Sequence, residues 1–454
     1  MSPVTDPPAT GKRDRSGVPP IGGRYQYVLL AVMSGTFGFV FFDRMILNSL
    51  IPFIKPELGL DNVAIGYLGG IPALTWALSG LLMGWLSDRA DRRKPFLIAA
   101  VVLFTVFSVL SGFVGGVASL LLLRGLMGAA EGGTMPLIQP LMFHSTEPKR
   151  RGLFIGLMQG SAPGLLGGVL SPLVAVWIAS EFGWRTAFFA TIIPGLLLTV
   201  VILLFVKELR LKQVAVATGA FDSSDTAPAI GSHAFERVPL GKILRERNVL
   251  VSLAVGLFFQ AWFAITTVFT PTFLTEVRGF SLGDMALIMS SIGVAWILWG
   301  AVVAAVSDRI GRRASMIAFA TISVLAPIVI MNVNGVWVMF GLLIVTYTGL
   351  GCFTLFMTVI PAESVPPAAV GTVVGLVMGF SEVTGGFLMP IVAGYIAEAT
   401  NLMVVMMLAS GAALVAAVLS CFYRETAPAR VSREGSGRVH TTPVESAIEA
   451  TRVD

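Results

Sequence analysis

The sequence predicts an all-α membrane protein, with twelve transmembrane helices in two pseudo-symmetric six-helix bundles, and three observations support this fold class. The chain of 454 residues is 55% hydrophobic and only 13% charged. A soluble domain carries roughly 25% charged residues, because its surface must be solvated. Long apolar runs follow one another along the chain, and two motifs recur in its second half at nearly the same offset. We therefore expect most of the chain to lie in a membrane and its two halves to share one plan.

The apolar runs define the predicted helices. Each run is long enough to cross about 30 Å of hydrocarbon, which takes about 20 helical residues. The first run begins near Tyr25 and is too long for the apolar part of a signal peptide, so we expect it to remain as a span. The predicted spans are 25–54, 64–87, 95–117, 119–143, 152–179, 185–206, 248–277, 281–306, 314–333, 335–360, 368–396 and 402–423.

One polar segment, 207–247, divides the spans into six and six. It carries Ser, Asp, Thr, Pro and Gly without apolar periodicity, as a linker does. We expect it to join an N-terminal bundle (25–206) to a C-terminal bundle (248–423). Residues 1–24 and 424–454 are polar and are predicted to be disordered tails.

The positions of lysine and arginine predict the orientation, because cytoplasmic loops carry an excess of both. Alternate connections hold little beyond Lys55, Arg185 and Arg278. The other connections are the basic ones: they comprise the long loop 207–247 and the residues Lys12, Arg13, Arg15, Arg24, Arg89, Arg92, Arg93, Lys94, Lys149, Arg150, Arg151, Arg309, Arg312 and Arg313. Both termini are therefore predicted to be cytoplasmic, and we expect the membrane to be a bacterial inner membrane.

Two unrelated patterns indicate an internal duplication. The sequence SDRADRR (87–93) closes the second span, and SDRIGRR (307–313) closes the eighth, which places Asp88 and Asp308 220 residues apart. Glycine recurs at every fourth position of the fifth and eleventh spans, and such a row lets a neighbouring backbone approach closely. The glycines are Gly152, Gly156, Gly160, Gly164 and Gly168, then Gly371, Gly375 and Gly379.

The two SDR copies resemble the signature loop of the major facilitator transporters. A carboxylate and arginines at a helix end can latch the cytoplasmic side in one conformation and release it in the other. The predicted gating residues are Asp88, Arg89, Arg92, Asp308, Arg309 and Arg312. Asp91 stands where that family usually has glycine, and Ala304 replaces the glycine that opens the second copy.

Four charged residues lie inside predicted spans, where a charge is costly unless it is paired or hydrated. Asp43 and Arg44 lie in the first span, and Arg124 and Glu131 in the fourth. Arg124 and Glu131 are seven residues apart, so they share one helix face. Asp43 and Arg44 are adjacent and are expected to reach different partners. The alternative interpretation is two buried ion pairs that only fix helix register.

This charge pattern resembles the anion:cation symporter family, which includes sialin, the vesicular glutamate carriers and bacterial sugar-acid symporters. The residues that carry it are Phe42-Asp43-Arg44 with Pro52, Arg124 with Glu131-Gly and Pro136, and Gly183-Trp184-Arg185 with Phe188. The resemblance is densest between residues 40 and 195. Met142-Phe143-His144 replaces the usual Trp-Phe-Pro of that family. Spinster-type lipid carriers share much of the charge pattern and stay open as an alternative.

The resemblance implies proton-coupled symport of a small organic anion by alternating access. Asp43 and Glu131 match the protonatable carboxylates, Arg44 the anion-binding arginine, and Arg124 the arginine that partners the carboxylates. A substrate carboxylate could take over a salt bridge to Arg44 once Asp43 is protonated, which would couple the two ligands.

The repeat offset suggests that the two halves differ in function. Projected onto the second half, Asp43 and Glu131 land on uncharged residues, namely Trp262 or Phe263 and Leu350 or Gly351. We therefore expect the N-terminal half to handle protons and the C-terminal half to shape the rest of the substrate site. Glu382 is the exception, and we expect a specificity group, a second proton site or a hydrated residue near the outer mouth. The other predicted substrate-binding residues are Gln159, Trp76, Gln260 and Tyr347.

The motifs of common enzymes are missing from the sequence. It has no GxSxG elbow, phosphate-binding loop, zinc-ligand spacing or dinucleotide fingerprint, so we expect no enzyme activity, cofactor or metal. The expected partners are a small organic anion, protons and membrane lipid, with no nucleic acid and a monomeric state. Two other functions stay open: export of lysolipid-like or sphingolipid-like amphiphiles or drugs, and sensing without transport.

Overall fold

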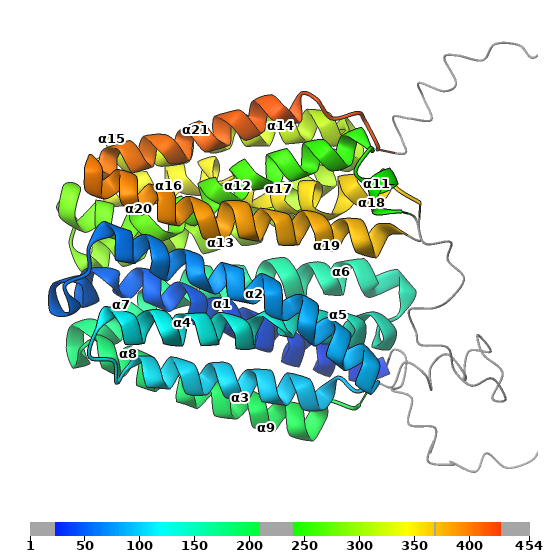
Figure 1. The fold of residues 1–454 in the computed structure, drawn as a ribbon, viewed down its shortest axis with the longest axis horizontal. Helices are drawn as coiled ribbons and strands as arrows, with labels where there is room; N and C mark the ends of the chain where they lie inside the picture. Colours follow the sequence, from blue (N-terminus) through cyan, green and yellow to red (C-terminus); the bar gives the residue numbers. More distant parts are fainter. Residues whose placement is uncertain (1–22, 209–238, 367–368, 428–454) are drawn as a thin grey trace, which may run out of the picture.

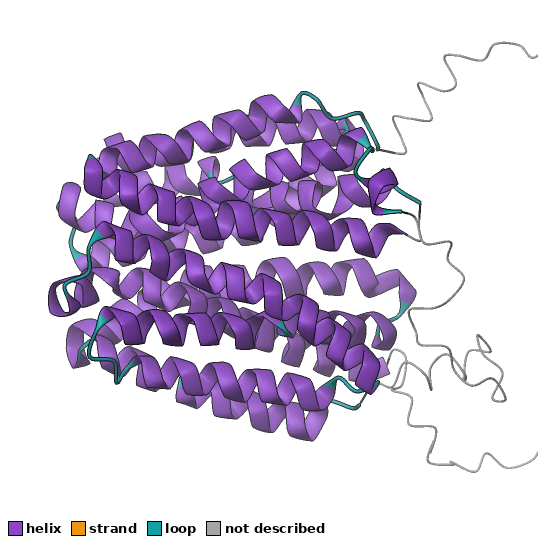
Figure 2. Ribbon diagram, in the orientation of Figure 1, coloured by secondary structure: helices purple, strands orange, loops and turns teal. Residues whose placement is uncertain are grey.

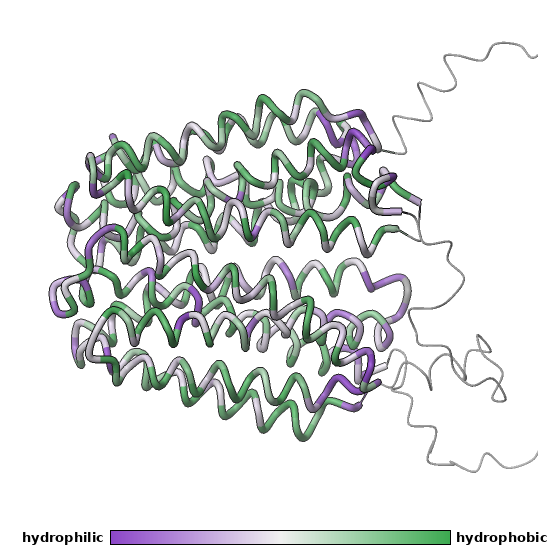
Figure 3. Tube along the Cα trace, in the orientation of Figure 1, coloured by the Kyte–Doolittle hydropathy of each residue, from purple (hydrophilic) through white to green (hydrophobic). Residues whose placement is uncertain are grey.

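The computed structural model describes residues 23–208, 239–366 and 369–427, and the regular structure in these ranges is helical (Figures 1 and 2). Long helices lie side by side, joined by short loops. The predicted tails and most of the predicted linker lie outside the described residues. Hydrophilic segments gather at the end where the described termini lie, and a short hydrophilic stretch interrupts the first bundle midway (Figure 3).

Residues before the linker form the N-terminal bundle. Its helices are α1 (Gly23–Leu58), α2 (Asn62–Ala90), α3 (Lys94–Ser111), α4 (Val117–Gly132), α5 (Thr134–Ser145), η1 (Pro148–Arg150), α6 (Arg151–Gly156), η2 (Leu157–Ser161), η3 (Pro163–Leu170), α7 (Ser171–Phe182), α8 (Trp184–Ala190) and α9 (Ile192–Phe205). The π-helical segments η2 and η3 continue α6 toward α7, so these four elements form one span.

The C-terminal bundle follows the linker. Its helices are α11 (Leu240–Ile243), α12 (Arg247–Thr272), η4 (Phe273–Val277), α13 (Leu282–Ile310), α14 (Arg312–Ser323), α15 (Leu325–Asn332), α16 (Val336–Thr346), α17 (Gly349–Thr354), η5 (Leu355–Val359), α18 (Ile360–Glu363), α19 (Val370–Ser381), η7 (Glu382–Leu388), α20 (Met389–Ala399) and α21 (Leu402–Ser420). Here too, π-helical segments continue three of the spans, at η4, η5 and η7.

Eleven helical segments of the described residues are long and apolar enough to cross a membrane. The predicted span that is missing from these eleven is the fourth. A break at Gly133 divides it into the shorter helices α4 and α5. Pro136 causes this break because it cannot donate a hydrogen bond to the carbonyl of Gly132. The backbone of Gly133 stays in the right-handed helical region (φ −69°, ψ −17°), so the chain continues in nearly the same direction.

The first SDR copy is held together by an arginine that the repeat did not single out. Arg93 donates to Asp88 at 2.5 Å, to Ser87 Oγ at 3.3 Å and to the carbonyl of Pro136 at 3.1 Å. Its side chain is only 5% exposed. Arg92 is exposed instead. This contact ties the end of α2 to α5.

The second SDR copy uses Arg312, as its position in the repeat predicts. Arg312 donates to Asp308 at 2.5 Å and to Ser307 Oγ at 2.6 Å. It also pairs with Glu363 of α18 at 3.0 Å. Arg309 and its counterpart Arg89 are both exposed, and Arg89 lies over the ring of Trp85.

The turn between the helices explains why the two copies differ. Gly311 adopts φ 104° and ψ 153°, a conformation that essentially only glycine reaches, and α14 begins at the next residue. Asp91 adopts a left-handed conformation (φ 50°, ψ 37°), which aspartate tolerates, and α3 begins three residues later. Because the first turn is longer, the arginine that donates to the aspartate of the motif is Arg93 and not Arg92, the residue that corresponds to Arg312.

Contacts between the bundles gather at the end opposite to the described termini, which we call the closed end. Lys55 pairs with Glu276 at 2.7 Å across this end. Asn62 donates to Glu398 at 3.0 Å, and the hydroxyl groups of Tyr67 and Tyr395 lie 3.5 Å apart. These polar contacts join α1 and α2 to η4 and α20.

Glycines bring the backbones together toward the closed end. A Cβ at Gly168 would lie 2.3 Å from Gly293 Cα of α13, and one at Gly66 would lie 2.5 Å from the carbonyl oxygen of Pro390. Six other glycines of the two rows have no atom within 4 Å of such a Cβ: Gly152, Gly156, Gly160, Gly371, Gly375 and Gly379. The first glycine row is therefore packed against α13 at Gly164 and Gly168 and faces open space before them, whereas the second row faces open space throughout.

Candidate functional site

The site is built midway between the ends, from side chains of both bundles. Helix α1 supplies Asp43 and Arg44, and α4 supplies Arg124 and Glu131. Asp43, Arg124 and Glu131 are each at most 1% exposed. The four charges that the sequence singled out therefore lie together inside the protein, where a charge is costly unless it has partners.

Asp43 is held by a chain of hydroxyl groups. Ser108 of α3 donates to Asp43 Oδ1, and Thr191 Oγ1 donates to Ser108 Oγ at 3.2 Å. The second carboxylate oxygen, Oδ2, is buried without a hydrogen-bond partner. One oxygen of Asp43 is thus fixed by the protein, and the other is free to take a proton.

Arg124 lies beside this carboxylate without a close ion pair. Its Nη1 donates to the backbone carbonyl of Asp43 at 3.4 Å, and its guanidinium carbon lies 5.1 Å from the centre of the Phe188 ring. Nε and Nη2 of Arg124 have no hydrogen-bond partner. Both carboxylate oxygens of Glu131 are also buried without a partner, although Glu131 is close enough to Arg44 and Arg124 to interact with each electrostatically. This part of the site holds several unused donors and acceptors.

Arg44 reaches across to the other bundle. Its Nη2 lies 3.5 Å from Oε2 of Glu382, the first residue of η7. Glu382 is 8% exposed, so it is a buried partner and not a hydrated residue near the outer mouth. This ion pair joins the two bundles at the level of the site.

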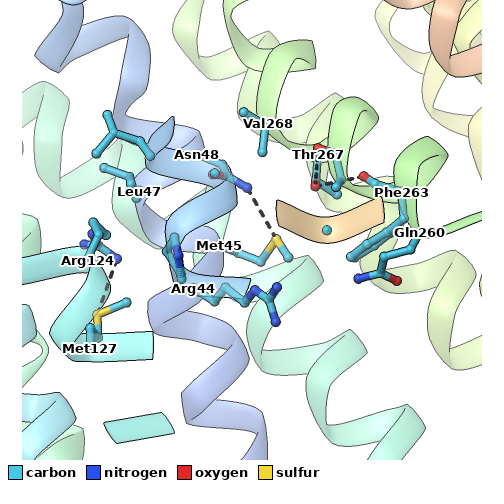
Figure 4. A pocket seen from close by; sticks show the side chains of 15 residues that line it. Arg44, Met45, Leu47, Asn48, Arg124, Met127, Gln260, Phe263, Thr267 and Val268 are labelled. Carbon is cyan, nitrogen blue, oxygen red and sulfur yellow. Dashed lines mark hydrogen bonds between the residues drawn. The ribbon is translucent and has the colours of Figure 1, made fainter. Parts of the chain in front are cut away.

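A small cavity lies beside Arg44, between the two bundles. Figure 4 shows Arg44 pointing toward the space that Gln260 of α12 faces from the opposite bundle. The cavity measures about 30 Å³, which is room for a water molecule or two. Its lining residues are Arg44, Met45, Leu47, Asn48, Leu68, Gly69, Pro72, Arg124, Met127, Gln260, Phe263, Ala264, Thr267, Val268 and Gly386.

The structure brings some predicted substrate-binding residues to this cavity and leaves others away from it. Arg44 and Gln260 line it, and Glu382 borders it through Gly386. Gln159 in η2 and Trp76 in α2 are partly buried and lie outside the lining. Tyr347 is 2% exposed and packs against the Trp262 ring, with centroids 6.0 Å apart. Its role, like those of Gln159 and Trp76, stays a prediction.

Sequence reasoning missed the residues that support the charges. Ser108 and Thr191 are ordinary polar residues of membrane helices, and no spacing links them to Asp43. Phe263, in contrast, lines the cavity at a position to which the repeat offset projects Asp43. The repeat offset thus leads from Asp43 to an aromatic residue of the C-terminal bundle that lines the cavity.

The chain belongs to the Major Facilitator Superfamily, whose family model matches residues 33–387 and 301–453. It is therefore an integral membrane protein of a transporter family and not an enzyme, as predicted. A solved structure of a bacterial homologue of the human lysosomal transporter Spinster shares the fold, with a TM-score of 0.64 and 18% identity. That match covers 88% of this chain and 95% of the other. The predicted fold of twelve helices in two bundles is confirmed.

Several relatives carry names that refer to organic anions. A probable 4-methylmuconolactone transporter of Cupriavidus pinatubonensis is 32% identical over 278 residues, which is 61% of each chain. A probable sulfoacetate transporter, SauU, of Cupriavidus necator is 26% identical over 92% of this chain and 98% of the relative. The hexuronate transporter of Bacillus subtilis is 27% identical over 87% of this chain and 92% of the relative.

Proposed function

We propose that this protein is a proton-coupled symporter that takes up a small organic anion by alternating access. The proposed membrane is a bacterial inner membrane, with both termini in the cytoplasm, because Lys and Arg are concentrated in the loops on that side. The names of the relatives, which refer to 4-methylmuconolactone, sulfoacetate and hexuronate, support an anionic substrate.

One observation carries the proposal: a buried group of charges borders the cavity between the bundles and includes oxygens without partners. A carboxylate that has left water favours its protonated form, and a nearby arginine favours the charged form. Both effects act on Asp43 and Glu131, since each carboxylate is buried and Arg124 lies close to both. Movement of these groups relative to Arg124 can therefore bind a proton in one conformation and release it in the other.

Arg44 is the proposed anchor for the substrate anion. It lines the cavity, and its guanidinium can hold a carboxylate through two parallel hydrogen bonds. Its present partner Glu382 lies at 3.5 Å, with no hydrogen bond formed, so the pair is open to exchange. Binding an anion here would replace a contact between the bundles with a contact to the substrate.

In the proposed cycle, the described conformation faces the cytoplasm. The closed end would be the outer end, and the glycine rows that face open space would line the inner opening. The two bundles would rock about the site, as in other carriers built from repeats. The two SDR motifs lie at the inner end, and their arginines pair within each bundle in this conformation.

The decisive experiment is uptake into proteoliposomes of a panel of radiolabelled organic acids, under an inward proton gradient. Wild type is compared with Arg44→Ala and with Arg424→Ala, an exposed arginine beyond α21 that serves as the matched control. We expect gradient-driven accumulation in wild type and Arg424→Ala, and its loss in Arg44→Ala.

A second pair of variants tests the coupling. Asp43→Asn and Glu131→Gln are expected to abolish proton-driven accumulation while partly keeping exchange of labelled for unlabelled anion. Full proton-driven uptake in either variant would contradict the assignment. If no organic anion accumulates and lysolipids or cationic dyes move instead, the protein belongs with the exporters of amphiphiles.

A further inference from the structure

Glu382 places a carboxylate of the protein where the proposed substrate anion would bind. It lies in η7 of the C-terminal bundle, and its Oε2 is 3.5 Å from Nη2 of Arg44 in the N-terminal bundle. Both side chains are largely buried, with 17% of Arg44 and 11% of Glu382 exposed. In this conformation the anchoring arginine is therefore already neutralised by an internal anion.

The surroundings of Glu382 are rich in hydrogen-bond acceptors that lack a donor. Glu382 Oε2 has no hydrogen-bond partner, and neither has Oε1 of Gln260, which is 3% exposed and lines the cavity. The two side chains meet above Gly386, where a Cβ would lie 2.7 Å from Glu382 Oε2 and 3.3 Å from Gln260 Nε2. Glycine at this position leaves both groups room to face the cavity.

The site has one more negative than positive group, so a second negative charge on the substrate would meet an excess of carboxylates. The site holds three carboxylates, Asp43, Glu131 and Glu382, and two guanidinium groups, Arg44 and Arg124. A single substrate carboxylate can pair with Arg44 once Glu382 is displaced. Like charges held close together in a poorly hydrated interior repel strongly. A second carboxylate on the substrate, directed toward the C-terminal bundle, would therefore lie against Glu382.

We propose that Glu382 makes the site selective for hydroxylated monocarboxylates over dicarboxylates. This inference rests on the proposed function. The substrate carboxylate displaces Glu382 from Arg44, and the released carboxylate then accepts hydrogen bonds from hydroxyl groups at the far end of the substrate. Gln260 lies beside it, with Nε2 near the same position above Gly386. A dicarboxylate offers no donor at that end and is rejected, because a buried carboxylate without a donor is costly.

Matched pairs of acids test this selectivity. D-Gluconate and D-glucarate differ in whether the terminal carbon is a primary alcohol or a carboxylate, and 4-hydroxybenzoate and terephthalate differ in whether the para group is a hydroxyl or a carboxylate. Uptake of each acid is measured in proteoliposomes for wild type, Glu382→Gln and Glu398→Gln. Glu398 lies at the closed end, where its partner Asn62 can still donate to a glutamine, so Glu398→Gln is the matched control.

We expect wild type and Glu398→Gln to favour the monocarboxylate of a transported pair by at least tenfold, which corresponds to about 1.4 kcal/mol. Glu382→Gln removes the negative charge at nearly constant shape, so its preference should fall to about twofold or less, through faster uptake of the dicarboxylate. Melting temperatures of the three proteins show whether each is folded.

The outcomes separate this inference from the proposed function. Equal or faster uptake of dicarboxylates by wild type overturns the role of Glu382 and leaves the anion symporter intact. The same holds if folded Glu382→Gln keeps the full preference for the monocarboxylate. If no acid of the panel or of these pairs is accumulated by wild type, the proposed function itself fails.

Discussion

The contact between Gly168 in η3 and Gly293 in α13 predicts how a single methyl group would change the conformation of the protein. A Cβ at Gly168 would lie 2.3 Å from Gly293 Cα and 2.7 Å from Gly293 N. Carbon atoms in contact prefer about 3.5–4.0 Å, so Gly168→Ala forces the two helices apart by about 1 Å or more. Gly160 lies about two turns earlier in the same row and faces open space, which makes Gly160→Ala the matched control.

The size of the effect follows from the cost of overpacking, about 1–3 kcal/mol. The strain exists only while the two bundles touch at this point, so it is released when they part. Gly168→Ala should therefore shift the balance of conformations about 5- to 150-fold toward the one that is open at this end. Gly160→Ala adds its methyl group to an unoccupied face and leaves the described conformation unstrained.

Alkylation of a buried cysteine measures this shift. Val268 is 3% exposed and packs against Gly69 of the opposite bundle, so a cysteine there is protected while the end stays closed. Val268→Cys is made in a background in which Cys352 and Cys421 are replaced by serine, and a membrane-impermeant maleimide is added from the closed side. We expect alkylation at least fivefold faster with Gly168→Ala than with Gly160→Ala. Equal rates would refute the argument that this glycine contact holds the end closed.

Two further predictions concern the ends of the bundles. Arg93→Ala should lower the free energy of unfolding by about 1–2 kcal/mol relative to Arg92→Ala, because the buried guanidinium of Arg93 joins α2 to α5 through Ser87 Oγ and the carbonyl of Pro136; fluorescence-detected melting checks this. Equal stability of the two variants would show that the contact contributes nothing. Lys55→Glu and Glu276→Lys should each speed alkylation from the closed side, and the double swap should restore the slow rate, with a coupling of up to about 1 kcal/mol. Purely additive effects would exclude a role for this pair.

The fold could be predicted because membrane spans need long apolar runs, and these runs are visible in the sequence. The fourth span illustrates the limit of that signal, since hydropathy does not show the break at Gly133. The break depends on the backbone, where Pro136 withholds a hydrogen bond from Gly132. Hydropathy likewise gives no sign of the π-helical segments. They differ from the α-helix in their backbone hydrogen bonds, but they are as apolar as the helices on either side.

The candidate site was partly predictable for a related reason. A charged residue inside an apolar run is conspicuous, so Asp43, Arg44, Arg124 and Glu131 could be identified one by one. Their partners could not, because pairing is a property of the tertiary structure. Glu382 lies 338 residues beyond Arg44 in the chain, and only the packing of the two bundles brings them to 3.5 Å. Arg93 is a further case, since the turn at Asp91 decides which arginine returns to Asp88.

The buried charges also determine how the protein responds to membrane voltage. With all five groups ionised, three carboxylates and two guanidinium groups leave one net negative charge inside the membrane. Voltage acts on such a charge with about 2.3 kcal/mol per 100 mV when the charge crosses the whole field. One bound proton cancels the net charge, so voltage would bias the reorientation of the empty, unprotonated carrier and have little effect on the singly protonated one. In the proposed proton-coupled cycle, the electrical sensitivity of the protein would therefore report how many protons are bound at each step.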